Sequence, residues 1–290
     1  MEKFLVNTAA PKSGPAARFI PAGAQPVHTQ SMDGVRVCRL FGMPFCDVTL
    51  DELVGLVDEQ IASRKPGYIA TPNVDHVCRF HRDPVFRNAY ENARLVLCDG
   101  MPIIWASKLL GRPLRQKLSG SDLIYWLSRH AAERGYSVYF FGAQEGVAAA
   151  TAERLKQQFP ALTIAGVQSP PFGFHTDPDA NAAATQRVRE SGADIVYIAL
   201  GSPKQEVWMK DNAEVCGVPA MIGVGGAFDF VSGRVRRAPE WMQRASLEWI
   251  WRLCQEPRRL WRRYLVEDML FVRLLMAELW AAYVSRRPRE

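Results

Sequence analysis

The chain has 290 residues, of which 48% are apolar, and it carries a formal net charge of +6. This length allows one sizeable core with a small appendage and argues against three independent domains. The six cysteines form no C-x-x-C pair, which argues against a structural zinc site and favours a reducing, cytosolic compartment.

Residues 1–33 are rich in Ala, Pro, Gly and polar residues and lack the apolar run of a signal peptide, so we interpret them as a mobile leader. From about residue 35, short apolar runs with strand character alternate with longer segments of helical period. This alternation predicts an α/β core over residues 34–236. The predicted strands cover residues 68–72, 95–98, 137–142, 162–167, 195–200 and 220–224.

The segments between these strands predict helices. Thr49 and Glu52 fit a capping box that opens the first helix, and Ser121 fits the cap of a later one. The predicted helices cover residues 50–64, 121–134, 145–159 and 204–215.

Polar or glycine-rich segments follow the predicted strands directly. They are TPN at 71–73, DG at 99–100, GAQ at 142–144, GSP at 201–203 and GG at 225–226. In open α/β sheets, ligands bind at the carboxyl ends of the strands. The sequence therefore predicts a binding site at this edge of the sheet.

Asp99 follows the apolar segment LVLC, so we expect its carboxylate to point into the crevice where reactants meet. There it can act as a general base that deprotonates an acceptor hydroxyl as that oxygen attacks an anomeric carbon. An Asp before a Gly is also an ordinary turn residue, and this alternative stays open.

Thr71 and Asn73 flank Pro72 and offer a hydroxyl and an amide that can hold sugar hydroxyls or an N-acyl group. The alternative is a capped turn that enters a helix at Val74.

Two further segments are candidates for binding a nucleotide diphosphate. The segment GSPKQE at 201–206 opens a helix whose free backbone N–H groups favour an anion. A plain strand-to-helix turn is the alternative, because the segment matches neither a dinucleotide-binding nor a P-loop motif. Further on, Gly225 and Gly226 allow a nucleotide to approach the backbone closely, and Asp229 can accept hydrogen bonds from ribose hydroxyls.

Residues 237–290 read as a helical appendage that is rich in aromatic and basic residues. From residue 236 to the end there are 12 arginines against 7 acidic residues, so this fifth of the chain supplies +5 of the charge. Charged residues interrupt every window long enough to cross a membrane. We expect the appendage to lie on a membrane surface or to mediate self-association.

Arg252, Arg259 and Arg262 project within about 80° of one another on a continuous helix and can then grip a phosphate together. The alternative is a solvated basic face, and Pro257 is able to interrupt the helix. Metal motifs are scarce, because the five histidines are dispersed and DPD at 177–179 lies in a Pro- and Gly-rich loop. We expect no metal and no cofactor.

Several segments together resemble the WecG/TagA/CpsF family of bacterial glycosyltransferases (glycosyltransferase family 26), in a match running from about residue 37 to 265. The motifs, in order along the chain, are TPN at 71–73, CDGMP at 98–102, GSDL at 120–123, GSPKQE at 201–206, GGAFDF at 225–230 and RAPEW at 237–241.

The resemblance implies a Rossmann-like, mostly parallel sheet with helices on both faces and an inverting, metal-independent transferase that uses a UDP-sugar. The implied acceptor is a polyprenyl-diphosphate-linked saccharide of a cell-surface polysaccharide or exopolysaccharide, elongated at the inner face of the cytoplasmic membrane. Asp99 matches the family's proposed base, and Asp229 lies with Gly225 and Gly226 in its nucleotide-binding motif. The sugar-contacting positions correspond to Thr71, Asn73 and Gln205, and the arginines proposed to grip the acceptor diphosphate correspond to Arg252, Arg259 and Arg262.

The chain departs from the family pattern at QKL, residues 116–118, where members usually carry Glu-Arg-Val. Lys117 keeps the positive charge of a substrate-binding arginine but loses its bidentate fork. The leader and the extension past residue 264 are also unusual. The donor sugar stays open among an N-acetylmannosamine type, its uronic acid and glucose.

Two other classes of protein remain alternatives at this point. A nicotinamide- or flavin-dependent oxidoreductase shares this kind of core, but the chain lacks the G-x-G-x-x-G motif that it needs. A nucleic-acid binder would use the basic tail, and the acidic residues and strand-end motifs argue against it.

Overall fold

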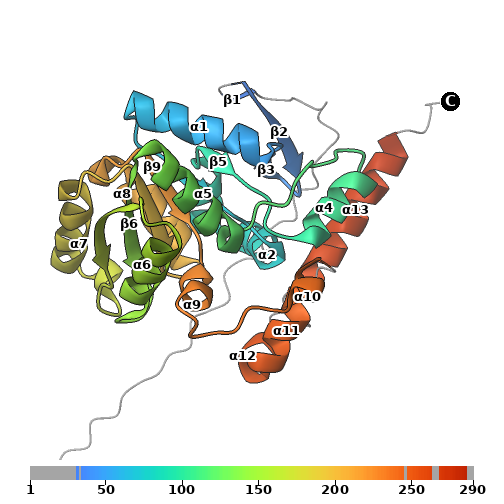
Figure 1. Ribbon diagram of the computed structural model, residues 1–290. Coiled ribbons are helices and arrows are strands. Elements are labelled where there is room, and N and C mark those ends of the chain that lie inside the picture. The colour runs from blue at the N-terminus through green and yellow to red at the C-terminus, as the bar shows by residue number, and fades with distance from the viewer. Residues whose placement is uncertain (1–30, 33, 245–246, 263–267, 286–290) are drawn as a thin grey trace, which may run out of the picture.

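The computed structural model describes residues 31–32, 34–244, 247–262 and 268–285 (Figure 1). At its centre lies a six-stranded sheet with strand order β5-β4-β9-β8-β6-β7, in which every neighbouring pair is parallel. The strands are β4 (Tyr68–Ala70), β5 (Leu95–Val96), β6 (Ser137–Gly142), β7 (Thr163–Gln168), β8 (Ile195–Ala199) and β9 (Ala220–Gly223). The predicted α/β fold with a mostly parallel sheet is confirmed.

Helices cover both faces of this sheet and pack against the strands through two apolar clusters, one on each face. On one face lie α1 (Leu50–Ser63), α5 (Gly120–Arg134), α6 (Val147–Gln158) and α9 (Ala227–Val231). On the other lie α2 (Val74–Arg82), α3 (Pro84–Glu91), α4 (Met101–Leu109), α7 (Pro178–Glu190) and α8 (Lys204–Cys216), with the short 3-10 helix η1 (Phe174–Thr176) before α7. Successive strand residues alternate between the clusters, as Phe140 and Phe141 do, because side chains point alternately to opposite faces of a strand.

The capping box at the start of α1 is confirmed, with the Thr49 side chain accepting from the Glu52 backbone and the Glu52 carboxylate accepting from the Thr49 backbone. The predicted cap at Ser121 is wrong, because α5 begins at Gly120 and its N-cap is Ser119. The chain needs Gly120 here, since a Cβ atom at this position would lie 2.9 Å from the Val224 Cα. Close packing against the end of β9 therefore fixes where α5 begins.

A small antiparallel sheet near the N-terminus was not predicted. It consists of β1 (Ser31–Met32), β2 (Val35–Leu40) and β3 (Met43–Cys46). The turn between β2 and β3 has positive φ angles at both Phe41 and Gly42, and it lacks the Asn-Gly pair that would have announced it. The other residues of the predicted leader, 1–30 and 33, lie outside the described part of the chain.

The C-terminal segment is helical, as predicted. It consists of α10 (Glu240–Arg244), α11 (Glu248–Gln255), α12 (Pro257–Arg262) and α13 (Met269–Ser285). In Figure 1, α13 runs along the core, where it packs against α2. Phe271 and Leu274 of α13 enter the core, and the Glu278 carboxylate accepts a hydrogen bond of 2.6 Å from the Phe41 backbone. Among the described helices, none combines the length and apolar character that a membrane span requires.

Candidate active site

A cleft of about 1280 Å³ opens at the carboxyl ends of the parallel strands. Every strand of the large sheet contributes to it through a residue that follows the strand's carboxyl end. These contributions are Thr71 after β4, Asp99 after β5, Ala143 after β6, Ser169 after β7, Leu200 after β8 and Val224 after β9. The cleft lies at the edge where the sequence placed a binding site.

Most of the candidate residues meet in this cleft. Its lining includes Thr71, Asn73, Asp99, Gln205, Gly225, Gly226, Asp229, Arg252 and Arg262. Lys117 is not among the lining residues, but its charge acts on Asp99. Arg259 belongs to α12, but its side chain lies outside the described part of the structure. The roles assigned to these residues stay predictions.

Asp99 is positioned by its backbone N–H, which donates a 3.0 Å hydrogen bond to the Pro72 carbonyl. Its side chain is partly exposed and lines the cleft. Loss of hydration raises the pKa of Asp99 to about 7, with Lys117 opposing this rise and Glu248 adding to it. A carboxyl group that titrates near neutrality is suited to take up a proton.

Four charged residues join the core to α11 close to Asp99. Arg237 contacts Asp122 at 2.6 Å and Glu248 at 3.2 Å, and the Lys117 ammonium lies 3.8 Å from each of the same two carboxylates. Burial tends to raise the pKa of Asp122, but its hydrogen bonds and positive neighbours lower it overall. These ion pairs fix the helix that carries Arg252 into the cleft.

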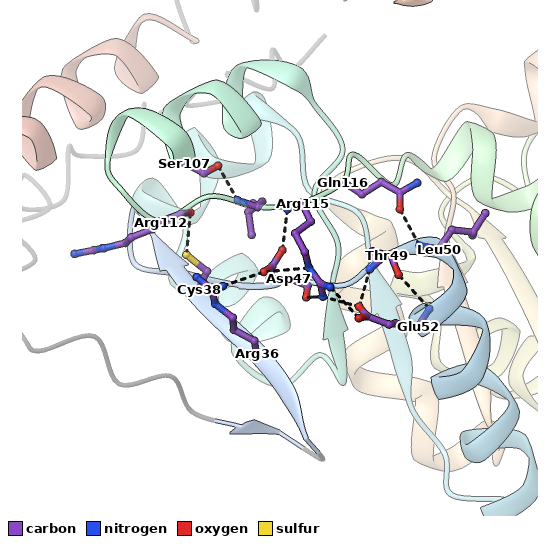
Figure 2. A network of polar contacts seen from close by, with 11 residues as sticks. Arg36, Cys38, Asp47, Thr49, Leu50, Glu52, Ser107, Arg112, Arg115 and Gln116 are labelled. Atoms are coloured by element: carbon purple, nitrogen blue, oxygen red, sulfur yellow. Dashed lines mark hydrogen bonds and ion pairs between the residues drawn. The ribbon is translucent and has the colours of Figure 1, made fainter.

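The loop between α4 and α5 carries Lys117 and is tied down on both sides of this residue; the contacts of Arg115 and Gln116, which precede it, are drawn in Figure 2. The Arg115 backbone donates to the buried Asp47 carboxylate at 2.8 Å, and the Arg115 guanidinium reaches Asp47 and Glu52. The Gln116 side chain accepts from the first residue of α1 at 2.8 Å, and Leu118 donates to the Cys98 carbonyl at 2.8 Å. The contacts of Arg115 and Gln116 span more than 60 residues, and no local sequence pattern announced them.

Thr71 and Gln205 hold the glycine-rich loop after β9. The Thr71 hydroxyl donates to the Gly223 carbonyl at 2.9 Å, and the Gly225 backbone donates to the Gln205 side-chain carbonyl at 3.0 Å. Gly225 has a φ of 56°, a conformation that favours glycine. Asn73 caps α2 by accepting from the His76 backbone at 3.4 Å, so the capped turn that stood as its alternative is present. These side chains shape the cleft, whatever they bind.

Basic residues also line the cleft. Arg234 lies 3.8 Å from Asp229, and the Arg252 guanidinium stands 5.6 Å from the centre of the Phe230 ring. Lys204, at the first turn of α8, lies 4.4 Å from the centre of the Phe172 ring. Neither Arg234 nor Phe172 was predicted as a site residue, because an isolated Arg or Phe carries no local pattern.

The three C-terminal arginines do not share one continuous helix, which corrects that expectation. Helix α11 ends at Gln255 and α12 begins at Pro257, because proline cannot continue the hydrogen bonding of the preceding helix. Arg252 and Arg262 nevertheless both line the cleft, from different helices.

The DPD segment caps a helix. The Asp177 carboxylate accepts from the backbones of Asp179 and Ala180 at 3.0 and 3.2 Å, at the start of α7. Over the described residues, no group of three or more His, Cys, Asp or Glu side chains is arranged to hold a metal ion.

Comparison with known proteins gives the family. The sequence profile of the glycosyl transferase WecG/TagA/CpsF family matches residues 38–285, and the chain belongs to this family. It is therefore a glycosyltransferase. The two alternative classes, an oxidoreductase and a nucleic-acid binder, are excluded.

Two bacterial relatives carry the name N-acetylglucosaminyldiphosphoundecaprenol N-acetyl-beta-D-mannosaminyltransferase. The protein from Bacillus spizizenii is 33% identical over 224 residues, which cover 77% of this chain and 84% of the relative. The protein from Bacillus subtilis is 26% identical over 227 residues, which cover 78% and 86% of the two chains.

Proposed function

We propose that this protein transfers a sugar from a UDP-sugar to a polyprenyl-diphosphate-linked saccharide, with inversion at the anomeric carbon and without a metal ion. The product serves a cell-surface polysaccharide or exopolysaccharide. The names of both relatives state the acceptor as an N-acetylglucosaminyl diphosphoundecaprenol, which supports this class of acceptor. The observation that carries the proposal is Asp99, which follows β5 in a cleft also lined by Arg252 and Arg262 and whose pKa is raised to about 7 by burial.

In the proposed reaction, Asp99 takes the proton of an acceptor hydroxyl while that oxygen forms a bond to the anomeric carbon. The bond from that carbon to the UDP oxygen breaks in the same step, and UDP leaves from the opposite face of the sugar. Inversion follows because there is a single displacement. One proton moves from the acceptor hydroxyl to Asp99, and the new carbon–oxygen bond to the acceptor replaces the one to UDP.

The negative charge that develops on the leaving diphosphate needs stabilisation. Arg252 and Arg262 line the cleft on one side, and the residues at the start of α8, including Ser202, line it on another. Guanidinium groups bind phosphate oxygens strongly, and the first N–H groups of a helix favour an anion. These groups support the proposal that no metal ion is needed.

We also propose that residues 237–290 act as one appendage that rests on the membrane surface at its cytoplasmic side. On α13, Met269, Val272, Met276, Trp280 and Tyr283 are exposed and follow one another at helical spacing, opposite the buried Phe271 and Leu274. Trp241, Trp249 and Trp261 are also exposed. The arginine excess of this segment suits anionic lipid headgroups, and a lipid-linked acceptor must be reached at such a surface.

Single-turnover transfer tests the proposed reaction. Radiolabelled UDP-sugars are offered with a polyprenyl-diphosphate-linked N-acetylglucosamine in detergent to the wild type, to Asp99→Asn and to Asp51→Asn, an exposed carboxylate on α1. We expect transfer by the wild type and by Asp51→Asn, and its collapse in Asp99→Asn. Transfer by Asp99→Asn at the wild-type rate would remove Asp99 as the base, and no transfer from any donor would overturn the proposed function.

A further inference from the structure

A second polar cluster lies in the wall of the cleft, between α2 and α8. His76 and Arg79 of α2 line the cleft together with Glu206 from the first turn of α8. Glu206 is only 1% exposed. The ring of Tyr90 closes the cluster from behind, with its hydroxyl 2.9 Å from His76 Nδ1.

Two buried atoms of this cluster lack hydrogen-bond partners among the described residues. Glu206 Oε1 accepts from the Gln205 amide at 3.0 Å, but Oε2 accepts from nothing, and the Nε of Arg79 donates to nothing. Burial raises the pKa of Glu206 to about 7, while its hydrogen bonds and the charge of Arg79 oppose this rise. Because buried polar groups in proteins are nearly always hydrogen bonded, an unpartnered acceptor and donor beside one cleft point to a ligand.

We propose that Glu206 and Arg79 together bind a donor–acceptor group of the transferred sugar, either a hydroxyl or an N-acyl amide. Such a group donates its O–H or N–H to Glu206 Oε2 and accepts from Arg79 Nε through its oxygen. This inference rests on the proposed function and adds a specificity subsite to it.

The opposite charges of Glu206 and Arg79 determine which chemical group can bind between them. A diphosphate would be repelled by the Glu206 carboxylate, and a cationic group would be repelled by the Arg79 guanidinium. A neutral group that both donates and accepts satisfies both residues at once. The position also fits a sugar, because Gln205, which hydrogen bonds to Glu206, contacts the loop where the nucleotide is proposed to lie.

The experiment measures dissociation constants by calorimetry for UDP alone and for UDP-N-acetylmannosamine, UDP-N-acetylglucosamine and UDP-glucose. The full-length wild type is compared with Glu206→Gln and Arg79→Met. The control variants are Glu214→Gln and Arg82→Gln, which change exposed residues on the same two helices. Thermal unfolding without ligand shows whether each variant keeps the wild-type fold.

For each pair variant we expect the dissociation constant of a bound UDP-sugar to rise about 10- to 100-fold, because a hydrogen bond to a charged group is lost. Binding of UDP alone and the melting temperature should stay near those of the wild type. A loss confined to the acetamido sugars identifies the group as the N-acyl amide, and a loss that includes UDP-glucose identifies a hydroxyl.

Three results would overturn the inference. Equal binding of UDP-sugars by the wild type and the pair variants would remove this subsite while leaving the proposed function intact. An equal loss of UDP and UDP-sugar binding would show that the pair shapes the cleft and does not contact the sugar. Failure of the wild type to bind any of these nucleotides would overturn both the inference and the proposed donor.

Discussion

The two sides of the cleft are held in place by different forces. On the strand-end side, α8 packs a full face into the core, with Trp208 and Met209 almost completely buried. On the other side lies α11, which the structure describes along its whole length and in which no residue is buried. Ion pairs at Glu248 and hydrogen bonds from Trp251 and Gln255 to the Arg236 carbonyl hold α11 instead.

The two sides should therefore differ in how rigidly they hold their residues and in how they respond to salt. Packing of buried side chains gives the strand-end side one arrangement that is insensitive to salt. Partly exposed ion pairs are weakened by salt, so the α11 side is expected to respond to ionic strength. The proposed base is placed by the first side, and the cations proposed to face the diphosphate are placed largely by the second.

The largest expected effect is at Asp99, the proposed base. With Asp99→Asn, we expect kcat to fall by about 10² to 10⁴, the usual contribution of a positioned proton acceptor. In the wild type, kcat/KM should fall as the pH drops through about 7, because the protonated carboxyl cannot accept a proton. Rates of the wild type and of Asp99→Asn measured from pH 5.5 to pH 9, about 1.5 to 2 units either side of that pKa, test the loss of kcat and the pH dependence. A wild-type profile that is flat across pH 7 would contradict this role.

The next largest effect concerns the α11 side. With Arg252→Ala, we expect kcat/KM to fall by about 10², because one cation no longer faces the developing charge on the diphosphate. Arg258→Ala on α12 is the matched control, since Arg258 is exposed and does not line the cleft. Steady-state kinetics on both variants check the prediction, and similar rates for the two would place the diphosphate elsewhere.

On the strand-end side the expected effect is on stability. Thr71→Val removes the hydrogen bond to the Gly223 carbonyl while keeping the side-chain shape. The free energy of unfolding should fall by about 1 to 3 kcal/mol, the cost of a buried polar group left without its partner. Urea unfolding of this variant, beside Thr163→Val at an exposed site on β7, measures the difference. Equal stability of the two would mean that the glycine-rich loop holds its shape without Thr71.

Sequence patterns located the strand-end side well. Apolar runs bounded by Gly, Pro, Asn and Asp mark where each strand of the parallel sheet ends, and the cleft follows from that edge. The hairpin of β2 and β3 was missed because its turn at Phe41 and Gly42 carries no strong turn signal. Pairs such as Arg115 with Asp47, or Glu206 with Arg79, depend on how distant segments pack, and no local period encodes them.

The smallest expected effect tests whether the two sides communicate through charge. Glu248 raises the pKa of Asp99 and Lys117 lowers it, so substitutions at these residues should move the acid limb of the kcat/KM profile in opposite directions. Glu248→Gln removes a negative neighbour, makes ionisation of Asp99 easier and shifts the limb to lower pH. Lys117→Gln removes a positive neighbour and shifts it to higher pH. Raising the salt concentration should reduce both shifts, because mobile ions screen charges that are partly exposed. If both variants moved the limb in the same direction, a displacement of α11 would be the cause, and the base would depend on the position of that helix more than on its charge.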